Sequence, residues 1–334
     1  MRRLPYRAEG ALRDMYLNAA RNHHYVSQAE QRLNAVNPTA DRRKQRILVF
    51  EVRDRDLPVL NLLDPRGTKI ESNLSSFDLF SFEVVDSRYR RNLEDIFGRY
   101  EGEVAQKSRG LIEKLRAGSA DIKAEVLDVF AIKLLNFFRN PYCVQKAMNT
   151  FGAATNYEPT DPDLKTAYRA VLNGSRPQIA SICAAFGLTP ELYESWLRAL
   201  FVILAPVAPV NIFEGTIKAL FEHNYVSVNV FDYAQPDEGD TCLLSDRGFN
   251  MPQQAENLFM FEFNLGARSF ACFQMSNLNE YDVRDDVKAR MKGHVDVRYV
   301  ANDRRLLAAY NQRTAYQCDT KVFAAKPSPR LAWP

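Results

Sequence analysis

The segment RILVFEVRD, Arg46–Asp54, decides the fold class of this chain. Its centre is rich in β-branched and aromatic residues and its ends are charged, which predicts a strand. The segment FDLFSFEVV, residues 77–85, alternates in the same way and predicts another strand. Pro65 and Gly67 supply turn chemistry between the two segments. Residues 1–85 are therefore expected to contribute strands to a sheet.

The next region, residues 86–223, has apolar side chains at helical spacing. Residues 89–115 predict one long helix, which its glycines weaken, and residues 122–138 predict a more buried helix. Thr189 and Pro190 are typical of the start of another helix, because they combine a capping side chain with proline at the first helical position. That helix is expected to end near Pro206, and another to run from about Val210 to His223, so the middle of the chain is expected to be helical.

The last region, residues 224–326, returns to the alternation of strands. Its predicted strands are NYVSVNVFDY (224–233), the pair within LFMFEFNLGARSFACFQM (258–275), VDVRYV (295–300) and TKVFAA (320–325), with a helix at 302–315. We expect residues 1–334 to form a single α+β unit. A mixed sheet would combine the N- and C-terminal strands, and the helical region would be inserted between them. Two separate domains are the alternative.

The composition excludes several classes of protein. Hydrophobic residues make up 46% of the chain and charged residues 25%, as in ordinary globular proteins. No stretch approaches the roughly 18 apolar residues that span a membrane. The N-terminal sequence MRRLPYRAEGALRD predicts no secretory signal. The 5 cysteines are scattered without a Cys-x-x-Cys motif, which argues against a disulfide framework and favours reduced thiols in the cytoplasm.

Positive charge is concentrated near the N-terminus. Residues 1–55 contain 12 Lys and Arg against 6 Asp and Glu, whereas the net charge of the whole chain is +3. Within this region Arg42, Arg43, Lys44 and Arg46 are dense enough to contact the phosphates of a nucleic acid. The alternative is a solvated loop before a strand.

The segment HHYVSQ places His23 beside His24. Neighbouring residues of a strand point to opposite faces, so these two imidazoles cannot easily bind one metal ion together. Three interpretations remain open. The histidines fix the strand by hydrogen bonds, or one of them acts on a ligand with distant partners. The third is a ββα-metal nuclease site that includes Asn34 and Asn37.

Two carboxylates are further candidates. Glu101 lies in the predicted long helix just before Gly102, where the missing side chain would let another backbone approach. Asp246 follows an apolar strand and precedes a glycine turn, which would place it at the rim of a sheet. A solvated acid and a turn former are the respective alternatives. The motifs of phosphate loops, serine esterases and zincins do not occur.

Five segments in this order resemble a bacterial family of proteins, domain of unknown function 4238. They are HHYVSQ, RILVFEVRD, NLEDIFGRYEGEVA, LLSDRGFN and AAYNQRTAYQCDTKVFA. The residues that match the motifs of that family are His23, His24, Tyr25, Val26, Gln28, Glu101, Gly102, Ser245, Asp246 and Asn311. The chain departs from the family at Ser27, where a proline is usual, and at AEQRL, which replaces an aromatic run. The third motif also lacks its proline. The resemblance implies no established activity.

Two functional hypotheses follow. In the first the protein is a hydrolase of nucleic acid, of the kind found in defence or toxin-type effectors. His24 would be its base or metal ligand, Asp246 and Glu101 its carboxylates, and a divalent metal its cofactor. His23, Gln28 and Asn311 would bind the ligand, and Arg42–Arg46 the phosphates. In the second hypothesis the protein is a non-enzymatic binding or regulatory module, in which the polar motifs are structural. The first requires the distant motifs to converge on one cleft.

Overall fold

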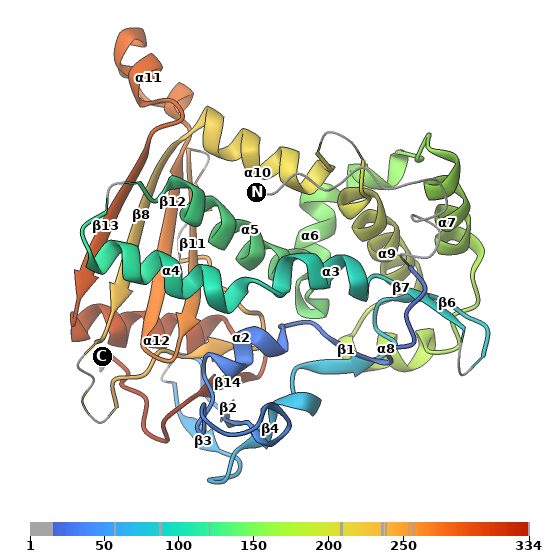
Figure 1. Ribbon diagram of the computed structural model, residues 1–334, viewed down its shortest axis with the longest axis horizontal. Helices are drawn as coiled ribbons and strands as arrows, with labels where there is room; N and C mark the ends of the chain where they lie inside the picture. Colours follow the sequence, from blue (N-terminus) through green and yellow to red (C-terminus); the bar gives the residue numbers. More distant parts are fainter. Residues whose placement is uncertain are drawn as a thin grey trace. The chain divides into compact units, whose positions relative to one another are not determined.

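A computed structural model describes residues 16–332, except 57, 87–88, 120, 208–209, 235–236, 238, 253 and 256 (Figure 1). The N-terminal residues 1–15, for which no secretory signal was predicted, lie outside this described part. Helices and strands both occur, and strands from both ends of the chain pair with one another. The predicted α+β class, with mixed sheets and a helical middle region, is thus confirmed.

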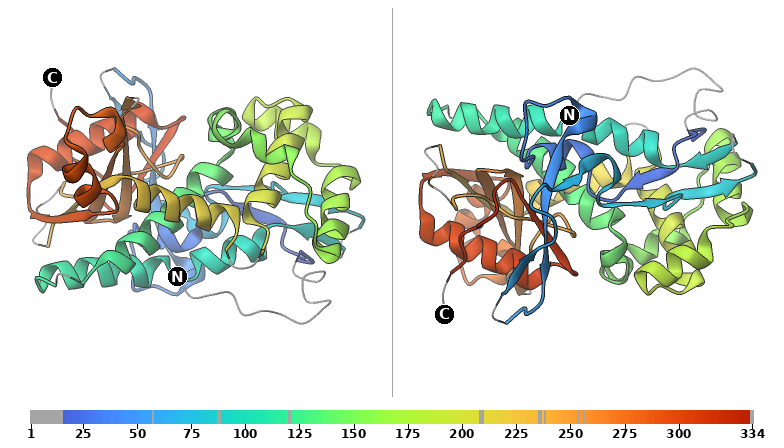
Figure 2. Two further views of the ribbon diagram at one scale, coloured as in Figure 1. Left: turned by 90° about the horizontal axis from the view of Figure 1, so that it is seen from above. Right: turned by 90° about the horizontal axis from the view of Figure 1, so that it is seen from below.

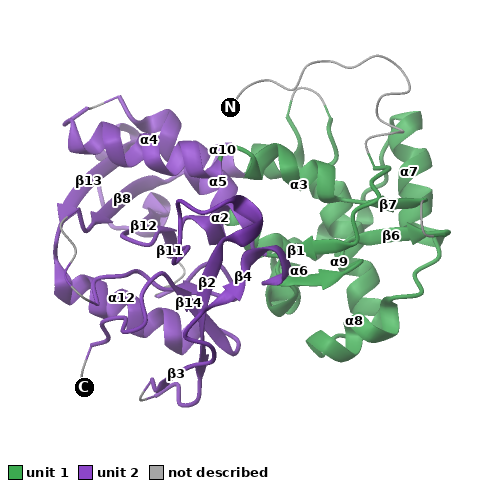
Figure 3. Cartoon of the chain, turned by 60° about the horizontal axis from the view of Figure 1, so that its bottom comes forward, with its two compact units in different colours: residues 1–25, 74–103, 134–216 green, residues 26–73, 104–133, 217–334 purple. Residues whose placement is uncertain are grey.

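The chain divides into two compact units, each of which is assembled from separate segments (Figure 3). Unit 1 comprises Met1–Tyr25, Leu74–Glu103 and Leu134–Thr216, and unit 2 comprises Val26–Asn73, Val104–Lys133 and Ile217–Pro334. The expected helical insertion, residues 86–223, therefore contributes to both units. The sequence ranges 1–85, 86–223 and 224–326 describe changes of secondary structure along the chain rather than the limits of the units.

Unit 1 is mainly helical. Its α-helices are α3 (Glu94–Glu101), α6 (Val144–Phe151), α7 (Pro162–Asn173), α8 (Ile179–Phe186) and α9 (Pro190–Leu204), with the end of α5 (Lys123–Arg139) and the start of α10 (Ile212–His223). Trp196 of α9 is buried, and its indole N–H donates to the carbonyl of Phe138 at 2.7 Å. The indole also packs edge-on against Phe80, with 5.7 Å between ring centroids. Aromatic side chains thus form the core of this unit.

Short strands lie beside these helices in unit 1. β1 (Asn22–His24) pairs antiparallel with β5 (Ser75–Phe77), and β6 (Ser81–Val84) pairs antiparallel with β7 (Arg90–Asn92). The segment 77–85, predicted as one strand, is therefore divided between β5 and β6. Asp78 adopts a positive φ of 53° between these strands, which turns the chain.

Unit 2 contains a sheet with the strand order β10-β11-β12-β8-β13. Its strands are β8 (Tyr225–Asp232), β10 (Gln254–Ala255), β11 (Leu258–Gly266), β12 (Ser269–Ser276) and β13 (Val295–Ala301). Helices cover both faces (Figures 1 and 2). On one face Phe130 of α5 contacts Phe273, with ring centroids 5.1 Å apart. On the other, Tyr310 of α12 (Arg304–Gln317) stacks on Phe270 at 4.1 Å.

A further sheet of unit 2 joins the two ends of the chain. It has the order β3-β2-β14-β9, with β4 beside β2. The strands are β2 (Arg46–Val52), β3 (Leu60–Leu62), β4 (Thr68–Lys69), β9 (Leu244–Ser245) and β14 (Lys321–Ala324). β2 is the strand predicted from RILVFEVRD, and its Val49 lies opposite Phe323 of β14. This sheet is the one that the sequence predicted, because it combines N-terminal and C-terminal strands. The predicted strands β8, β11, β12 and β13 instead belong to the five-stranded sheet described above.

The helices of the middle region agree with the sequence in most places. α5, α9 and α10 begin and end close to the predicted positions, and the Thr189 hydroxyl accepts from the Leu192 amide at 3.2 Å as a cap. The long helix predicted over 89–115 is wrong in two respects. Its first residues form strand β7, so the helix begins only at Glu94. It is also interrupted between α3 and α4 (Val104–Arg116), at Gly102. Two glycines within five residues, Gly98 and Gly102, weaken the helix at this point.

The remaining helices of unit 2 are short. α2 (Gln28–Arg32) follows the histidine motif, and α11 (Asp285–Met291) precedes β13. Across the described residues, no helix combines the length and the apolar character needed to cross a membrane. The cysteines are all buried and unbridged.

Candidate functional site

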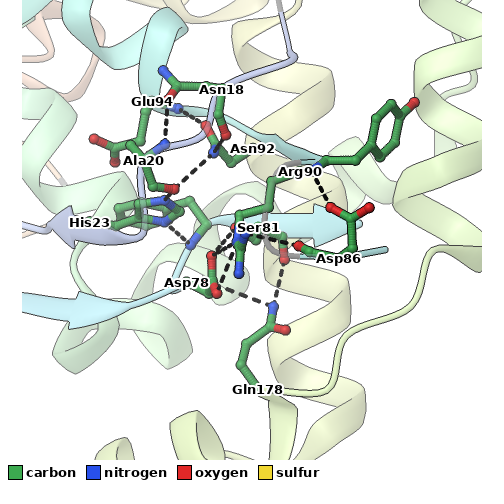
Figure 4. Close-up of polar contacts among 12 residues, drawn as sticks. Asn18, Ala20, His23, Asp78, Ser81, Asp86, Arg90, Asn92, Glu94 and Gln178 are labelled. Atoms are coloured by element: carbon green, nitrogen blue, oxygen red, sulfur yellow. Dashed lines mark hydrogen bonds and ion pairs between the residues drawn. The ribbon is translucent and has the colours of Figure 1, made fainter. Parts of the chain in front are cut away.

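His23 is the most completely defined residue of the predicted site. It is fully buried in β1, beside Ser76 of β5. The Phe80 amide donates to its Nδ1 at 2.9 Å. Nδ1 is thus an acceptor, so Nε2 carries the proton and donates to the Ala20 carbonyl at 3.0 Å (Figure 4). Burial, above all other effects, lowers the pKa of His23 from 6.5 to about 4. His23 is therefore a neutral imidazole that joins two backbone segments.

A charged network surrounds this histidine (Figure 4). Asp78 accepts from Arg90 Nε at 3.0 Å and from the Ser81 hydroxyl at 2.8 Å, and both Asp78 and Arg90 are buried. Gln178 of the segment before α8 donates to the Ser81 carbonyl at 2.8 Å. The network fixes the turn between β5 and β6. Nothing in the sequence indicated it, because Asp78 fell within the predicted strand 77–85 and Arg90 within the predicted helix 89–115.

His24 is adjacent on β1 and is also buried, with 8% of its surface exposed. Its register partner is Ser75 of β5. Because successive side chains of a strand point to opposite faces, His24 lies on the face of β1 opposite to His23. This is the arrangement that the sequence predicted for the two imidazoles.

Glu101 forms an ion pair with the buried guanidinium of Arg139, at the end of α5. Arg139 also lies over the ring of Phe97, with 5.3 Å from Cζ to the ring centroid, and donates to Asn136 Oδ1 at 3.1 Å. Glu101 is therefore not a freely solvated acid. A Cβ atom added to Gly102 would meet only the carbonyl oxygen of Gly98, in the preceding turn of the helix, among the described residues. The sequence had suggested that Gly102 lets the backbone of another segment approach, and no described segment does so.

Glu94 is a neighbour that sequence analysis missed. It lies on the same face of α3, seven residues before Glu101. Burial raises its pKa from 4.5 to about 7, and the charge of Arg139 opposes this shift only in part. Arg139 thus acts on two carboxylates of one helix.

Asp246 lies directly after β9 and is buried. Its carboxylate accepts from the amides of Asp319 and Thr320, each at 2.7 Å, and from the amide of Lys321 at 2.9 Å. Burial raises the pKa of Asp246, whereas these amides lower it. The observed contacts fix the turn that leads into β14, a different turn from the one at Gly248 that the sequence suggested for Asp246.

Asn311 of α12 also bonds to backbone. Its Nδ2 donates to the carbonyls of Thr241 at 2.9 Å and Arg330 at 2.8 Å, and its Oδ1 accepts from the Leu243 amide at 2.9 Å. The amide thereby joins α12 to the segment before β9 and to the C-terminal segment. The partners of Asn311 in the described part of the chain are thus backbone groups and not Asp246, although both residues belong to unit 2.

The residues after the histidines form the start of α2. Ser27, which stands where the resembled family has proline, caps the helix by accepting from the Glu30 amide at 3.1 Å. Gln28 Oε1 accepts from Arg32 at 2.5 Å, on the next turn. The departure at Ser27 is thus a helix cap of its own, and Gln28 supports the helix.

Asn34 and Asn37, considered as metal ligands, have other partners. Asn34 exchanges a pair of amide hydrogen bonds with Asn264 of β11, at 2.9 and 3.1 Å. Asn37 Oδ1 accepts from the Arg46 amide at 2.8 Å. Among the described residues, no group of three or more His, Cys, Asp or Glu side chains is placed to bind a metal ion. The ββα-metal arrangement is therefore not supported.

A basic cluster lies at the start of β2. We define it as Arg32, Arg42, Arg43, Lys44, Arg46 and Lys69, all in unit 2. Arg42, Arg43 and Lys44 form a short 3₁₀ turn and are exposed. Asp41 caps this turn by accepting from the Arg43 amide at 3.0 Å. Within the described part of the chain, none of these three cations forms an ion pair.

The other members of the basic cluster lie close to this turn. Arg46 donates to the Gly67 carbonyl at 2.6 Å and lies opposite Lys69 in the β2–β4 pair. The pKa of Arg32 is lowered, first by burial and then by the charge of the neighbouring Arg42. The cluster therefore places like charges side by side on a defined backbone.

Unit 2 also has ion pairs with buried carboxylates that the sequence did not reveal. Lys133 of α5 donates to Glu30 of α2 at 2.8 Å, and both side chains are at most 2% exposed. Asp232, at the end of β8, accepts from Arg116 at 2.6 and 2.8 Å and from the Tyr299 hydroxyl at 2.8 Å. These pairs connect helices to the sheet and to one another within the unit.

The residues of the predicted catalytic site belong to different units. His23, His24 and Glu101 lie in unit 1, and Gln28, Asp246 and Asn311 lie in unit 2. Their convergence therefore stays a prediction. Compared with family models, with curated proteins and with solved structures, the chain has no significant match, so the resemblance to domain of unknown function 4238 also stays a prediction.

Proposed function

We propose that this protein is a non-enzymatic cytoplasmic module that binds nucleic acid by its phosphate backbone, through the basic cluster. The observation that carries the proposal is the turn at Arg42, Arg43 and Lys44. Its exposed cations have no ion pair among the described residues, and Asp41 and Arg46 fix its backbone on either side. A run of uncompensated cations attracts phosphates and releases their counterions.

The contacts of the motif residues support a structural role for them. His23 uses both ring nitrogens on backbone groups, and Asn311 uses its whole amide in the same way. Asp246 accepts from consecutive amides of one turn. The imidazole of His23 has no free lone pair or proton to exchange with a substrate unless it first loses one of these bonds, and the bonds of Asp246 and Asn311 hold backbone segments together.

Binding to labelled duplex DNA and to duplex RNA of equal length tests the proposal. Replacing Arg42, Arg43 and Lys44 together by glutamine should weaken binding by at least about tenfold at low salt, because three phosphate contacts are lost. The matched control replaces Arg284, Arg290 and Lys292, near α11, by glutamine. It removes the same charge from another surface and should leave binding nearly unchanged. Equal losses in both variants would contradict a role for the basic cluster.

The same preparations test the predicted hydrolase. The proposal expects DNA and RNA to remain intact in the presence of Mg²⁺ or Mn²⁺. Cleavage by the wild-type protein that His24→Ala abolishes, without a change in thermal stability, would contradict a non-enzymatic module. It would instead support the hydrolase with His24 as its base or metal ligand.

A further inference from the structure

The edge of the larger sheet in unit 2 carries this inference. β13 pairs in parallel with β8, with Val297 opposite Val228. It is the last strand in the order β10-β11-β12-β8-β13, and no other strand of the described residues pairs with it (Figure 1). An edge strand of this length presents a row of backbone donors and acceptors to any further strand.

The hydrogen bonds at the two ends of β13 show which groups face outward. The Val226 amide donates to the His294 carbonyl at 3.0 Å, and the Asn302 amide donates to the Asp232 carbonyl at 2.9 Å. In a parallel pair, alternate residues of a strand bond to the same neighbour. The even-numbered residues of β13 therefore bond to β8, and the amides and carbonyls of Val295, Val297 and Tyr299 point away from the sheet.

The charges of β13 are arranged for pairing with an identical strand. Arg298 is 70% exposed and Asp296 is 32% exposed, and they now pair with each other along one strand at 3.2 Å. If a second β13 were placed antiparallel with Val297 opposite Val297, Asp296 would face the partner's Arg298 on both sides of the two-fold axis. Val295 would face the partner's Tyr299. The outward-pointing backbone groups would then exchange hydrogen bonds.

The same charges disfavour the neighbouring register. Moving the two-fold axis to Arg298 would also satisfy the outward-pointing groups, but it would place Arg298 directly opposite the partner's Arg298. Like charges directly opposite in a sheet are destabilising, whereas opposite charges stabilise the pair. The charge pattern of β13 thus selects the register centred on Val297.

We infer that β13 is a self-association surface, at which a second copy of the chain adds its own β13 antiparallel, centred on Val297. The two sheets would become one continuous sheet across a two-fold axis. This inference does not depend on the proposed binding of nucleic acid.

Charge exchange tests the register. Sedimentation of the full-length wild type over a wide concentration range should show a reversible dimer. Asp296→Arg and Arg298→Asp should each weaken dimerisation by about tenfold or more, because each variant puts like charges opposite one another. A mixture of the two variants should form heterodimers, since each Arg then faces an Asp. The double variant D296R/R298D should dimerise like the wild type.

Disulfide formation gives a second test, which does not depend on the charge variants folding. Val297→Cys places two thiols across the axis, in a pair whose Cα atoms are roughly 5.5 Å apart, within disulfide range. Mild oxidation should therefore link two chains. The control is Ala301→Cys on the same strand, which in this register does not face its own copy and should not be linked. The native cysteines are buried.

Three results would overturn the inference. They are a wild type that stays monomeric at all concentrations, a dimer that none of the charge variants weakens, and linking of the Ala301→Cys protein as rapid as that of the Val297→Cys protein.

Discussion

At the scale of single residues, the histidine pair shows how a sequence motif and a structural role can be confused. HHYVSQ has the residue types of a catalytic or metal site. The tautomer of His23 is nevertheless fixed by the Phe80 amide, and its other nitrogen donates to the Ala20 carbonyl. The imidazole thus supplies a hydrogen-bond partner to each of these two backbone groups. The sequence left such a structural role open as one of three interpretations. Partners on the backbone leave no trace in the amino-acid sequence, so Phe80 and Ala20 could not be predicted as the partners.

We expect His23→Ala to lower the free energy of unfolding of the protein by about 2–4 kcal/mol at pH 7. The change leaves the buried Phe80 amide without its acceptor, removes a hydrogen bond to the Ala20 carbonyl and creates a cavity beside the Phe80 ring. The midpoint of thermal unfolding should fall by several degrees. His223→Ala is the control, because His223 is exposed and its loss should change stability by less than about 0.5 kcal/mol. Equal stability of the two variants would refute the structural role.

The effect of His23→Ala should depend on pH. The pKa of His23 is about 4 in the folded protein and 6.5 when exposed, so the neutral ring is the form that stabilises the fold. Its contribution is complete above pH 6.5 and is lost as the pH falls to 4, by about 3 kcal/mol in all. The difference in stability between wild type and variant should therefore shrink between pH 6.5 and 4. The buried Glu94 is present in both the wild type and the variant, so its contribution to the pH dependence of stability cancels in the difference between them. Urea unfolding at several pH values measures this, and a constant difference would contradict it.

Asp246 and Asn311 show the same limit of sequence reasoning. Both were predicted as site residues, and Asp246 bonds to residues 319–321, which the sequence did not connect with it. The partners of Asn311 lie at Thr241, Leu243 and Arg330, far away in sequence. Without the fold, a buried amide that joins such segments cannot be distinguished from one that binds a ligand.

At the scale of elements, periodicity predicted most helices and strands. α5, α9, α10, α12, β2, β8, β11, β12, β13 and β14 lie where the patterns placed them. These elements have a strongly apolar face, and that face is what the patterns detect. The interruption of the long helix at Gly102 was not predicted, because apolar spacing continues from α3 into α4. A division between units falls at the same place, between Glu103 and Val104.

The buried pair of Lys133 and Glu30 gives a prediction for the packing of α2 on α5. We expect Lys133→Met to cost about 3–5 kcal/mol of stability, because it leaves the Glu30 carboxylate buried without its cation. Adding Glu30→Leu should recover most of the loss. The exposed pair of Lys218 and Glu222 is the control, and breaking it should cost less than about 0.5 kcal/mol. A double variant no more stable than Lys133→Met alone would contradict this account.

At the scale of the whole molecule, the sequence predicted the fold class better than the organisation of the chain. The pairing of β2 with β14 follows from the apolar strands at both ends. The composition of the units could not be inferred, because each unit combines three distant segments. Local patterns carry no information on which helix of the middle region packs with which strands. The run of positive charge at Arg42–Arg46 can be read from the sequence, and the structure adds the fixed turn that carries it and the neighbours Arg32 and Lys69. Its contact with phosphates stays a prediction.

The salt dependence of nucleic-acid binding tests the central claim most directly. The logarithm of the binding constant should fall linearly with the logarithm of the salt concentration. Replacing Arg42, Arg43 and Lys44 by glutamine should reduce the steepness of this line by about 2 to 3 on duplex DNA, because up to three phosphate contacts are lost. The variant at Arg284, Arg290 and Lys292 should keep the wild-type slope. Wild-type protein that does not bind, or a slope that is the same in all three proteins, would contradict the account.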